Sequence, residues 1–376
     1  MSEIIARIAD GVSSFQAADW DRCAGAGNPF LSHAFLSALE ESGSAAARTG
    51  WQPTPIAIDG PDGRPAAVMP AYLKSHSQGE YVFDHGWASA YERAGGRYYP
   101  KLQIAVPFTP VPGRRLLAAD PNHAQGLIAA AEAVVGNNNL SSAHATFIHP
   151  DEVPAFERAG WLIRVDSQFH WHNDGYESFD EFLGSLASRK RKAIRKERRE
   201  ALQGLTVEHI TGSAITEAHW EAFWRFYQDT GARKWGRPYL TRSFFSLLGE
   251  RLADRVLLVF ALRDGVPIAG ALNLVGDDTL YGRYWGTCAE VPHLHFEICY
   301  YQAIEAAIAR GLKRVEAGAQ GEHKLSRGYR PVPTFSAHYL ADPRLRAAVS
   351  DFLDAERRAV SHEIAILGEM GPFRKA

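Results

Sequence analysis

The chain has 376 residues, of which 46% are hydrophobic and 22% are charged, and its formal net charge is −2 at pH 7. This length is ample for two domains with separate hydrophobic cores, and the composition excludes disorder over most of the chain. The near-neutral charge argues against a surface given over to nucleic acid, so we expect no DNA binding, although it leaves room for a local basic site. The three cysteines, Cys23, Cys288 and Cys299, are too scattered for a disulfide framework or a cysteine-rich zinc site.

We expect neither a targeting segment nor a membrane span. The N-terminal stretch lacks the basic head and the continuous apolar run of a signal peptide. The longest apolar run, 256–262, is far shorter than the roughly 18 residues that a membrane-spanning helix needs. Together with the sparse cysteines, these features predict a cytoplasmic protein in a reducing compartment.

Predictions for the first half rest on apolar periodicity and on the breaks between apolar runs. The predicted order is helical material over 17–42, strands over 53–59, 64–76 and 98–108, a helix over 122–135, a strand over 141–149, a helix over 151–159 and a strand over 161–173. The pattern then breaks at 174–178. We therefore predict a first domain at 1–175 and a second at 176–376.

The second half shows a clearer pattern, with turn dipeptides such as Asp264-Gly265 between its apolar runs. The predicted order is a helix over 178–203, a strand over 205–210, helices over 216–231 and 241–252, strands over 255–264, 265–276 and 278–287, a helix over 294–310, strands over 312–318 and 333–340, and a helix over 343–367.

This order predicts an α/β (α+β) fold of the acetyltransferase type. Three antiparallel strands precede a helix, whose crossover leads to a strand parallel to the last of the three. The divergence of those two parallel neighbours would form the cleft for an acyl donor. The first half repeats the same order more faintly, so we predict a tandem pair of acetyltransferase-like domains, each a mixed, mostly antiparallel sheet with flanking helices.

The densest local feature is the run SRKRKAIRKERRE, residues 188–200, in which eight basic residues face only two glutamates. On a helix, Arg191 and Arg195 lie on one side, with Lys192 next to them. Guanidinium groups in a row suit a phosphate or pyrophosphate, because their forked geometry matches the oxygens of the anion. We take these three residues as candidates for binding a nucleotide-linked substrate or an RNA backbone; the alternative is a solvated helix face.

A second feature is the segment GAQGEHKLSRGYRPVP, residues 318–333, which directly follows the strand that would flank the cleft. Acylation of an amine requires a base to remove a proton, and Glu322 and His323 are the candidates for this catalytic role. Lys324 is a candidate contact for the donor or for a developing oxyanion. The alternative is a polar surface loop with glycine turns.

A third feature is YGRYWG, residues 281–286, where Arg283 is expected to face the cleft. The nearby His293, His295 and Glu297 superficially suggest a metal site. However, residues 293 and 295 diverge on a helix, so we expect no metal.

In the first half, the segment 83–115 is rich in glycine, tyrosine and charged residues and lacks a clean periodicity. This composition favours a segment that lines a binding site, as a binding wall, over a strand of the structural framework. Alternatively, Asp84 and His85 form a buried hydrogen-bonded pair. The candidate substrate-binding residues of this segment are Asp84, His85, Tyr99 and Lys101.

In combination, the basic run, YGRYWG, HFEICYYQAIEAAIARGL and GAQGEHKLSRGY resemble the FemAB-like branch of the Gcn5-related N-acetyltransferase superfamily. The segment 81–117 is also similar to that branch, and the resemblance extends from about residue 15 to residue 370. It implies a tandem pair of acetyltransferase-like domains. Fem ligases move an amino acid from aminoacyl-tRNA onto the amine of a peptidoglycan precursor, and their basic helical segment matches this chain at Arg191, Lys192, Arg195 and Lys196.

Two departures bear on the donor. The sequence has no coiled-coil arm of the kind that Fem ligases commonly insert, and it lacks the Q/R-x-x-G-x-G/A loop with which acetyl-CoA enzymes bind pyrophosphate. The corresponding segment, AEVPHLH at 289–295, contains no glycine. We therefore expect an acyltransferase without a tightly bound cofactor that acylates an amine acceptor, with aminoacyl-tRNA ahead of acyl-CoA as the donor. The alternative is a non-catalytic protein that recognises a peptidoglycan precursor or RNA.

Overall fold

The computed structural model describes residues 5–234, 238–318 and 321–374, with the side chains at 230–234 and at 322 outside this description. Contacts divide the chain into two compact units. Unit 1 comprises Met1–Asp166 and Pro333–His362, and unit 2 comprises Ser167–Val332 and Glu363–Ala376. The sequence-based boundary at 175/176 had assigned 333–362 to the second domain, whereas contacts group this segment with unit 1.

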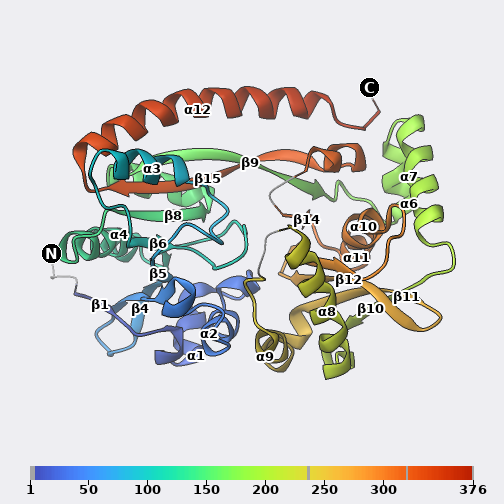
Figure 1. The fold of residues 1–376 in the computed structure, drawn as a ribbon, viewed down its shortest axis with the longest axis horizontal. Coiled ribbons are helices and arrows are strands. Elements are labelled where there is room, and N and C mark those ends of the chain that lie inside the picture. Colours follow the sequence, from blue (N-terminus) through green and yellow to red (C-terminus); the bar gives the residue numbers. More distant parts are fainter. Residues whose placement is uncertain (1–4, 235–237, 319–320, 375–376) are drawn as a thin grey trace. The chain divides into compact units, whose positions relative to one another are not determined.

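The strands of unit 1 form two sets (Figure 1). One set has the order β1-β3-β4-β7, and the other contains β2, β5, β6, β8 and β15. Strands β6 and β8 are parallel, and the other pairs among these strands are antiparallel. The strands are β1 (Ala6–Ile8), β2 (Trp51–Pro53), β3 (Ile56–Asp59), β4 (Pro65–Met69), β5 (Ala71–Lys74), β6 (Lys101–Ile104), β7 (Leu117–Ala118), β8 (Ser142–Ile148) and β15 (Arg330–Leu340), the last of which begins in unit 2.

Helix α4 packs on strands β3, β4, β6 and β8 and covers the main core of unit 1. It begins after Asp120, whose side chain accepts a hydrogen bond from the backbone of Asn122, and Pro121 occupies its first turn. The helices of this unit are α1 (Ala17–Ala24), α2 (His33–Glu41), α3 (His85–Arg93), α4 (Pro121–Asn137), α5 (Val153–Arg158) and most of α12 (Pro343–Glu369), with short 3-10 turns at Val12–Ser14, Pro29–Leu31, Ala47–Thr49 and Pro150–Glu152.

Unit 2 is built on a mixed sheet of order β10-β11-β12-β13-β14-β9. Strands β13 and β14 are parallel, and the neighbouring pairs are antiparallel. Helix α8 packs on β12 and β13, and α11 packs on β13 and β14. The strands are β9 (Leu162–His172, which begins in unit 1), β10 (Thr206–Thr211), β11 (Val256–Arg263), β12 (Val266–Val275), β13 (Thr279–Thr287) and β14 (Arg314–Glu316).

The helices of unit 2 surround this sheet and bury an apolar core that includes Trp171, Phe182 and Tyr301. They are α6 (Phe179–Ser185), α7 (Ser188–Ala201), α8 (Glu217–Lys234), α9 (Arg242–Leu252), α10 (Leu294–Phe296), the π-helical segment η7 (Glu297–Tyr301) and α11 (Gln302–Ala309), with 3-10 turns at Gly212–Ala214, Ala253–Arg255 and η8 (Glu322–Arg327).

These elements confirm the predicted α/β class and most of the predicted order. At Asp264-Gly265 both residues have positive φ, 51° and 75°, as a tight hairpin between β11 and β12 requires. The helix predicted over 178–203 is broken, however, because Leu186 is buried in an extended conformation and Ala187 donates its backbone N–H to Pro372. The segment 83–115 is not an irregular wall throughout, since α3 and β6 lie within it.

Candidate active site

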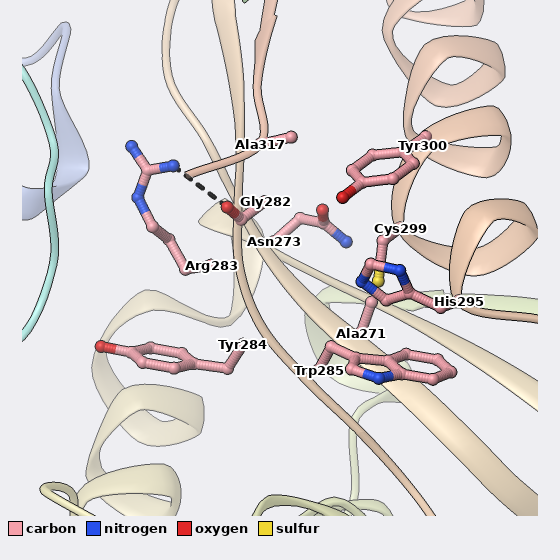
Figure 2. Close-up of a pocket in the computed structure, with 10 residues that line it drawn as sticks. All are labelled: Ala271, Asn273, Gly282, Arg283, Tyr284, Trp285, His295, Cys299, Tyr300 and Ala317. Atoms are coloured by element: carbon pink, nitrogen blue, oxygen red, sulfur yellow. Dashed lines mark hydrogen bonds between the residues drawn. The ribbon is translucent and has the colours of Figure 1, made fainter. Parts of the chain in front are cut away.

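The candidate active site of unit 2 is the cleft where β13 and β14 separate. The two strands pair over only three positions, Thr279↔Arg314, Leu280↔Val315 and Tyr281↔Glu316. Beyond this point they enclose a cavity of about 80 Å³ (Figure 2). The lining residues are Ala271, Asn273, Gly282, Arg283, Tyr284, Trp285, His295, Cys299, Tyr300 and Ala317.

Local sequence keeps this cleft open. A β-bulge between Leu272 and Asn273 shifts the register of β12 against β13. Gly282 follows the last paired residue of β13, and a Cβ atom there would lie 3.2 Å from the side-chain oxygen of Asn273. On the opposite wall, the π-helical segment η7 inserts an extra residue into its helix and carries Cys299 and Tyr300.

The polar group on this wall is a hydrogen-bonded pair. The hydroxyl of Tyr300 lies 2.9 Å from Nε2 of His323, which belongs to η8. Burial raises the pKa of Tyr300 above its ordinary value, so this hydroxyl holds its proton at neutral pH. His323 is exposed. One hydrogen bond therefore links the hydroxyl of Tyr300, in the lining of the cleft, to a side chain that solvent reaches.

Lys324 is a buried amine next to this pair. Its side chain is 1% exposed, and its Nζ donates a hydrogen bond of 2.8 Å to the carbonyl oxygen of Gly318. Among the described side chains it forms no ion pair. Burial lowers the pKa of Lys324 to about 7, and the charge of Arg283 acts in the same direction. The amine of Lys324 therefore loses its proton more readily than the amine of an exposed lysine.

Arg283 forms a buried ion pair with Glu316 at the point where the strands separate. The guanidinium nitrogen lies 2.9 Å from the carboxylate, and the two side chains are 1% and 2% exposed. A second nitrogen donates to the carbonyl oxygens of Gly282 and Glu316, at 3.0 and 3.2 Å. Arg283 thus lies in the lining of the cleft, as part of a link between β13 and β14.

The turn η8 is held in place by Arg327. Its guanidinium donates two hydrogen bonds, of 2.9 and 3.0 Å, to the carboxylate of Glu197 on α7 and stacks over the ring of Phe296. Tyr301 also donates a hydrogen bond to Glu197. These contacts therefore hold the segment that carries His323 and Lys324 against the basic helix α7.

Helix α7 turns most of its cations outward. Arg191 and Arg198 are only partly exposed, and Arg198 bridges the carboxylates of Glu297 and Glu305 at 2.9–3.0 Å. Arg195 pairs with the exposed Asp180 at 2.9 Å. Arg191 and Lys192 have no carboxylate within ion-pair distance among the described residues. Their charges are available to an anion.

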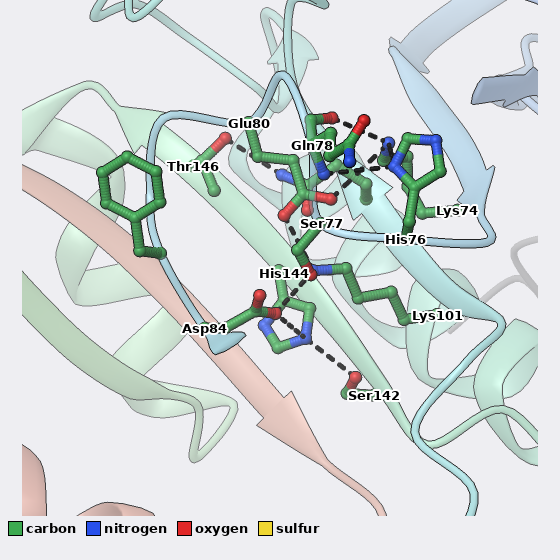
Figure 3. A network of polar contacts seen from close by, with 12 residues as sticks. Lys74, His76, Ser77, Gln78, Glu80, Asp84, Lys101, Ser142, His144 and Thr146 are labelled. Carbon is green, nitrogen blue, oxygen red and sulfur yellow. Dashed lines mark hydrogen bonds and ion pairs between the residues drawn. The ribbon is translucent and has the colours of Figure 1, made fainter. Parts of the chain in front are cut away.

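The candidates in unit 1 form a separate cluster (Figure 3). Lys101 is fully buried, and its Nζ lies 2.7 Å from Glu80 and 2.5 Å from Asp84. Burial alone would lower the pKa of Lys101, but the charges of these two carboxylates outweigh it and raise the pKa. Asp84 does not form the alternative pair with His85, which is exposed and stacks on Phe83.

This cluster continues through further buried polar groups. The carboxylate of Asp84 accepts a hydrogen bond of 2.7 Å from Tyr98, and His144 lies 2.8 Å from His338. Tyr99 is half-buried, with its hydroxyl 2.8 Å from Ser77. Burial lowers the pKa of His144 to about 3, so this network contains neutral histidines.

The structure thus gathers some of the sequence-predicted residues and separates others. Arg283, His323 and Lys324 lie at or beside the cleft of unit 2. Arg191, Lys192 and Arg195 lie on α7, while Asp84, Tyr99 and Lys101 belong to the cluster in unit 1. Glu322 begins η8, but its side chain lies outside the described residues. The catalytic roles of Glu322 and His323 stay predictions.

Sequence reasoning missed three residues of the cleft, Asn273, Cys299 and Tyr300. A signal existed for Asn273, because it is a single polar residue in the otherwise apolar run of β12. No comparable signal marks Tyr300, since its direction depends on the π-helical segment.

Among the described residues, no group of three or more side chains could hold a metal ion. No helix in the part of the chain that the structure describes is long and apolar enough to span a membrane.

The fold and the cleft define a tandem pair of acetyltransferase-like domains, as the sequence predicted. A family model described as peptidoglycan biosynthesis/recognition matches residues 11–375, and the chain therefore belongs to the FemAB-like family. This finding confirms the resemblance in the sequence.

Solved structures share the fold at low sequence identity. The chain is similar to FemX, with a TM-score of 0.55, 14% identity and coverage of 89% of this chain and 98% of that one. It is also similar to L-PGS from Bacillus licheniformis, with a TM-score of 0.50, 9% identity and coverage of 93% and 99%.

A curated Mycobacterium tuberculosis protein named 8-amino-7-oxononanoate synthase 2 is 29% identical over 198 residues. That match covers 50% of this chain and 25% of the relative, so the chain spans about a quarter of that protein's length.

Proposed function

We propose that the chain transfers an acyl or aminoacyl group to an amine in the cleft between β13 and β14. The observation that carries this proposal is the opening of the parallel strand pair beyond Tyr281↔Glu316, where a small cavity meets the hydrogen-bonded pair of Tyr300 and His323. Family membership supports a role with peptidoglycan precursors.

The cleft suits an activated carbonyl compound. From Gly282 onward, the edge of β13 that faced β14 has no strand partner in the described chain, so its peptide groups can bind an extended donor. Such binding places the carbonyl carbon in a fixed position for attack, and positioning is a large part of catalysis in acyl transfer. The ion pair of Arg283 and Glu316 fixes the width of the cleft at its closed end.

The attacking amine must lose a proton. In the proposed route, the amine donates to the hydroxyl oxygen of Tyr300 while that hydroxyl donates to Nε2 of His323, which passes the proton to solvent. The amine nitrogen forms a bond to the carbonyl carbon as the ester or thioester bond to the carrier breaks, and the released hydroxyl or thiol group of the carrier takes a proton from solvent. Glu322 is the alternative acceptor. Lys324, with its pKa of about 7, is suited to stabilise charge on the carbonyl oxygen when protonated.

Aminoacyl-tRNA is the favoured donor. Arg191 and Lys192 on α7, which pair with no carboxylate among the described residues, offer contacts to a phosphate backbone. A CoA donor has less support, because the segment 289–295 before α10 lacks glycine and carries the exposed Glu290, which would repel a pyrophosphate. The amine acceptor is proposed to belong to a peptidoglycan precursor. The alternative function, recognition of such a precursor without chemistry, is favoured by no feature of the cleft.

A transfer assay tests the proposal. The purified protein is incubated with a labelled aminoacyl-tRNA or acyl-CoA and with an amine-bearing peptidoglycan precursor, and the labelled product is measured. His323→Gln and Tyr300→Phe should each lower kcat by about 10²–10⁴-fold with the fold intact, because each interrupts the route of the proton. A similar loss of kcat in Glu322→Gln, with normal turnover in His323→Gln, would show that Glu322 is the base instead.

Tyr176→Phe serves as a matched control, since Tyr176 is a half-buried tyrosine of unit 2 whose hydroxyl donates a hydrogen bond of 3.1 Å to Ser185, outside the cleft. It should keep normal turnover. An absence of transfer from either donor would support recognition without chemistry. Normal turnover of the His323→Gln, Tyr300→Phe and Glu322→Gln variants would contradict the proposed route of the proton.

A further inference from the structure

The floor of the cleft contains a buried hydrogen-bond acceptor that no described residue satisfies. Asn273 is 0% exposed, and its Oδ1 has no hydrogen-bond partner among the described residues. Its Nδ2 donates a hydrogen bond of 3.2 Å to the carbonyl oxygen of Leu257. That bond fixes the orientation of the amide, because the reverse orientation would bring two carbonyl oxygens together. The oxygen therefore lies on the side of the cleft.

The position of this oxygen points to a ligand. Asn273 is the cross-strand neighbour of Gly282, and a Cβ atom on Gly282 would lie 3.2 Å from Oδ1. Figure 2 shows the amide extending from β12 toward the side on which Tyr300 and His295 lie. Buried polar atoms are nearly always paired, because leaving one unpaired costs free energy. A glycine opposite a lone acceptor keeps room for a group that pairs with it.

Chemistry and space narrow the identity of that group. An amide oxygen only accepts, so the ligand must present a donor. The cleft closes at Tyr281↔Glu316 and encloses about 80 Å³, so the bulky carrier of a donor stays outside and only the transferred group reaches Asn273. A simple acyl group has no N–H to offer, whereas an aminoacyl group has its α-amino group.

We propose that Asn273 Oδ1 accepts a hydrogen bond from the α-amino group of the transferred aminoacyl group, and so selects aminoacyl over simple acyl donors. This inference rests on the proposed transferase function and names a residue that selects its donor. The same acceptor chemistry could serve the amine of the acceptor substrate, which the test below separates.

The test uses two amide-linked, unreactive probes, an alanyl aminonucleoside and its propionyl counterpart, which differ only in the α-amino group. The wild-type protein should bind the alanyl probe about tenfold more tightly in calorimetry. Asn273→Leu, which removes the acceptor, should abolish this preference. Asn273→Asp keeps an acceptor but cannot donate to Leu257, so it should retain the preference and separate ligand recognition from the structural bond.

The inference is overturned if the wild type binds both probes equally or binds neither. It is also overturned if a folded Asn273→Leu variant keeps the preference, or if that variant raises only the KM for the amine acceptor. If the wild type transfers from charged tRNA yet shows no preference between the probes, the proposed function stands and this inference falls. If it transfers from no donor, the proposed function falls.

Discussion

In unit 1, strands β6 and β8 run parallel over Leu102↔Ala143 to Ile104↔Ala145, and in unit 2, β13 and β14 run parallel over the same number of positions. Beyond these paired residues, the space next to β8 in unit 1 is filled by the chain itself. The fully buried Arg115 donates to the carbonyl oxygen of Thr146 at 3.0 Å, and Gly113 donates to that of Phe147 at 3.0 Å. In unit 2, the corresponding space is the cleft that contains Asn273 and Tyr300.

The two units also differ in the partners and the pKa of a buried lysine. Lys101 in unit 1 lies between Glu80 and Asp84, which keep it charged. Lys324 in unit 2 donates to a carbonyl oxygen and has a pKa of about 7. The comparison teaches that a repeated fold can leave one parallel strand pair open and fill the space beyond the other with structural contacts.

The largest effect is expected on stability, when each of the two buried lysines is replaced in turn. Lys101→Met leaves Glu80 and Asp84 buried without their main counter-charge and should lower the free energy of unfolding by about 3–5 kcal/mol. The matched variant Lys324→Met removes a largely neutral amine at pH 8 and should cost less than about 1.5 kcal/mol. Urea denaturation followed by tryptophan fluorescence measures both. Equal costs would contradict the contrast.

The pH dependence sharpens the same contrast. The folded-state pKa of Lys324, about 7, lies below the unfolded value of about 10.4, so the folded protein binds fewer protons between these pH values. The wild-type protein should therefore gain stability, relative to Lys324→Met, as the pH rises from 7 to about 10, by about 3–4 kcal/mol. A difference between the two proteins that does not vary with pH would show that Lys324 keeps an ordinary pKa.

A comparable effect, on activity, is expected from filling the cleft. Gly282→Val places methyl groups beside the Asn273 oxygen and should lower kcat/KM for transfer by about 10²–10³-fold. Gly136→Val is the control, because a Cβ on Gly136 of α4 meets nothing within 4 Å. If Gly282→Val stays folded and fully active, the donor does not bind between β13 and β14.

The smallest effect concerns α7. Replacing Arg191 and Lys192 with Gln should weaken tRNA affinity by about tenfold and lower the salt dependence of binding by about one unit of slope per lost phosphate contact. The control replaces Arg64 and Arg93, exposed cations of unit 1, in the same way. Equal effects of both pairs would mean that binding depends on overall charge.

Sequence reasoning recovered what depends on local pattern. It predicted the order of the elements from β10 to β14 and the hairpin at Asp264-Gly265, while the catalytic role of the segment that carries His323 stays a prediction. It could not assign 333–362 to unit 1, since that grouping depends on the pairing of β15 with β8, far away in the sequence. Nor could it show that Lys101 is buried between carboxylates, or that the side-chain oxygen of Asn273 has no hydrogen-bond partner in the part of the chain that the structure describes.

The most direct measurement is a crystal structure of the protein with the unreactive alanyl aminonucleoside. The account predicts that the alanyl group occupies the cleft between β13 and β14, with its amino group within hydrogen-bonding distance of Asn273 and its carbonyl group near Tyr300. Binding of the alanyl group in unit 1, beside Lys101 and Asp84, would contradict it.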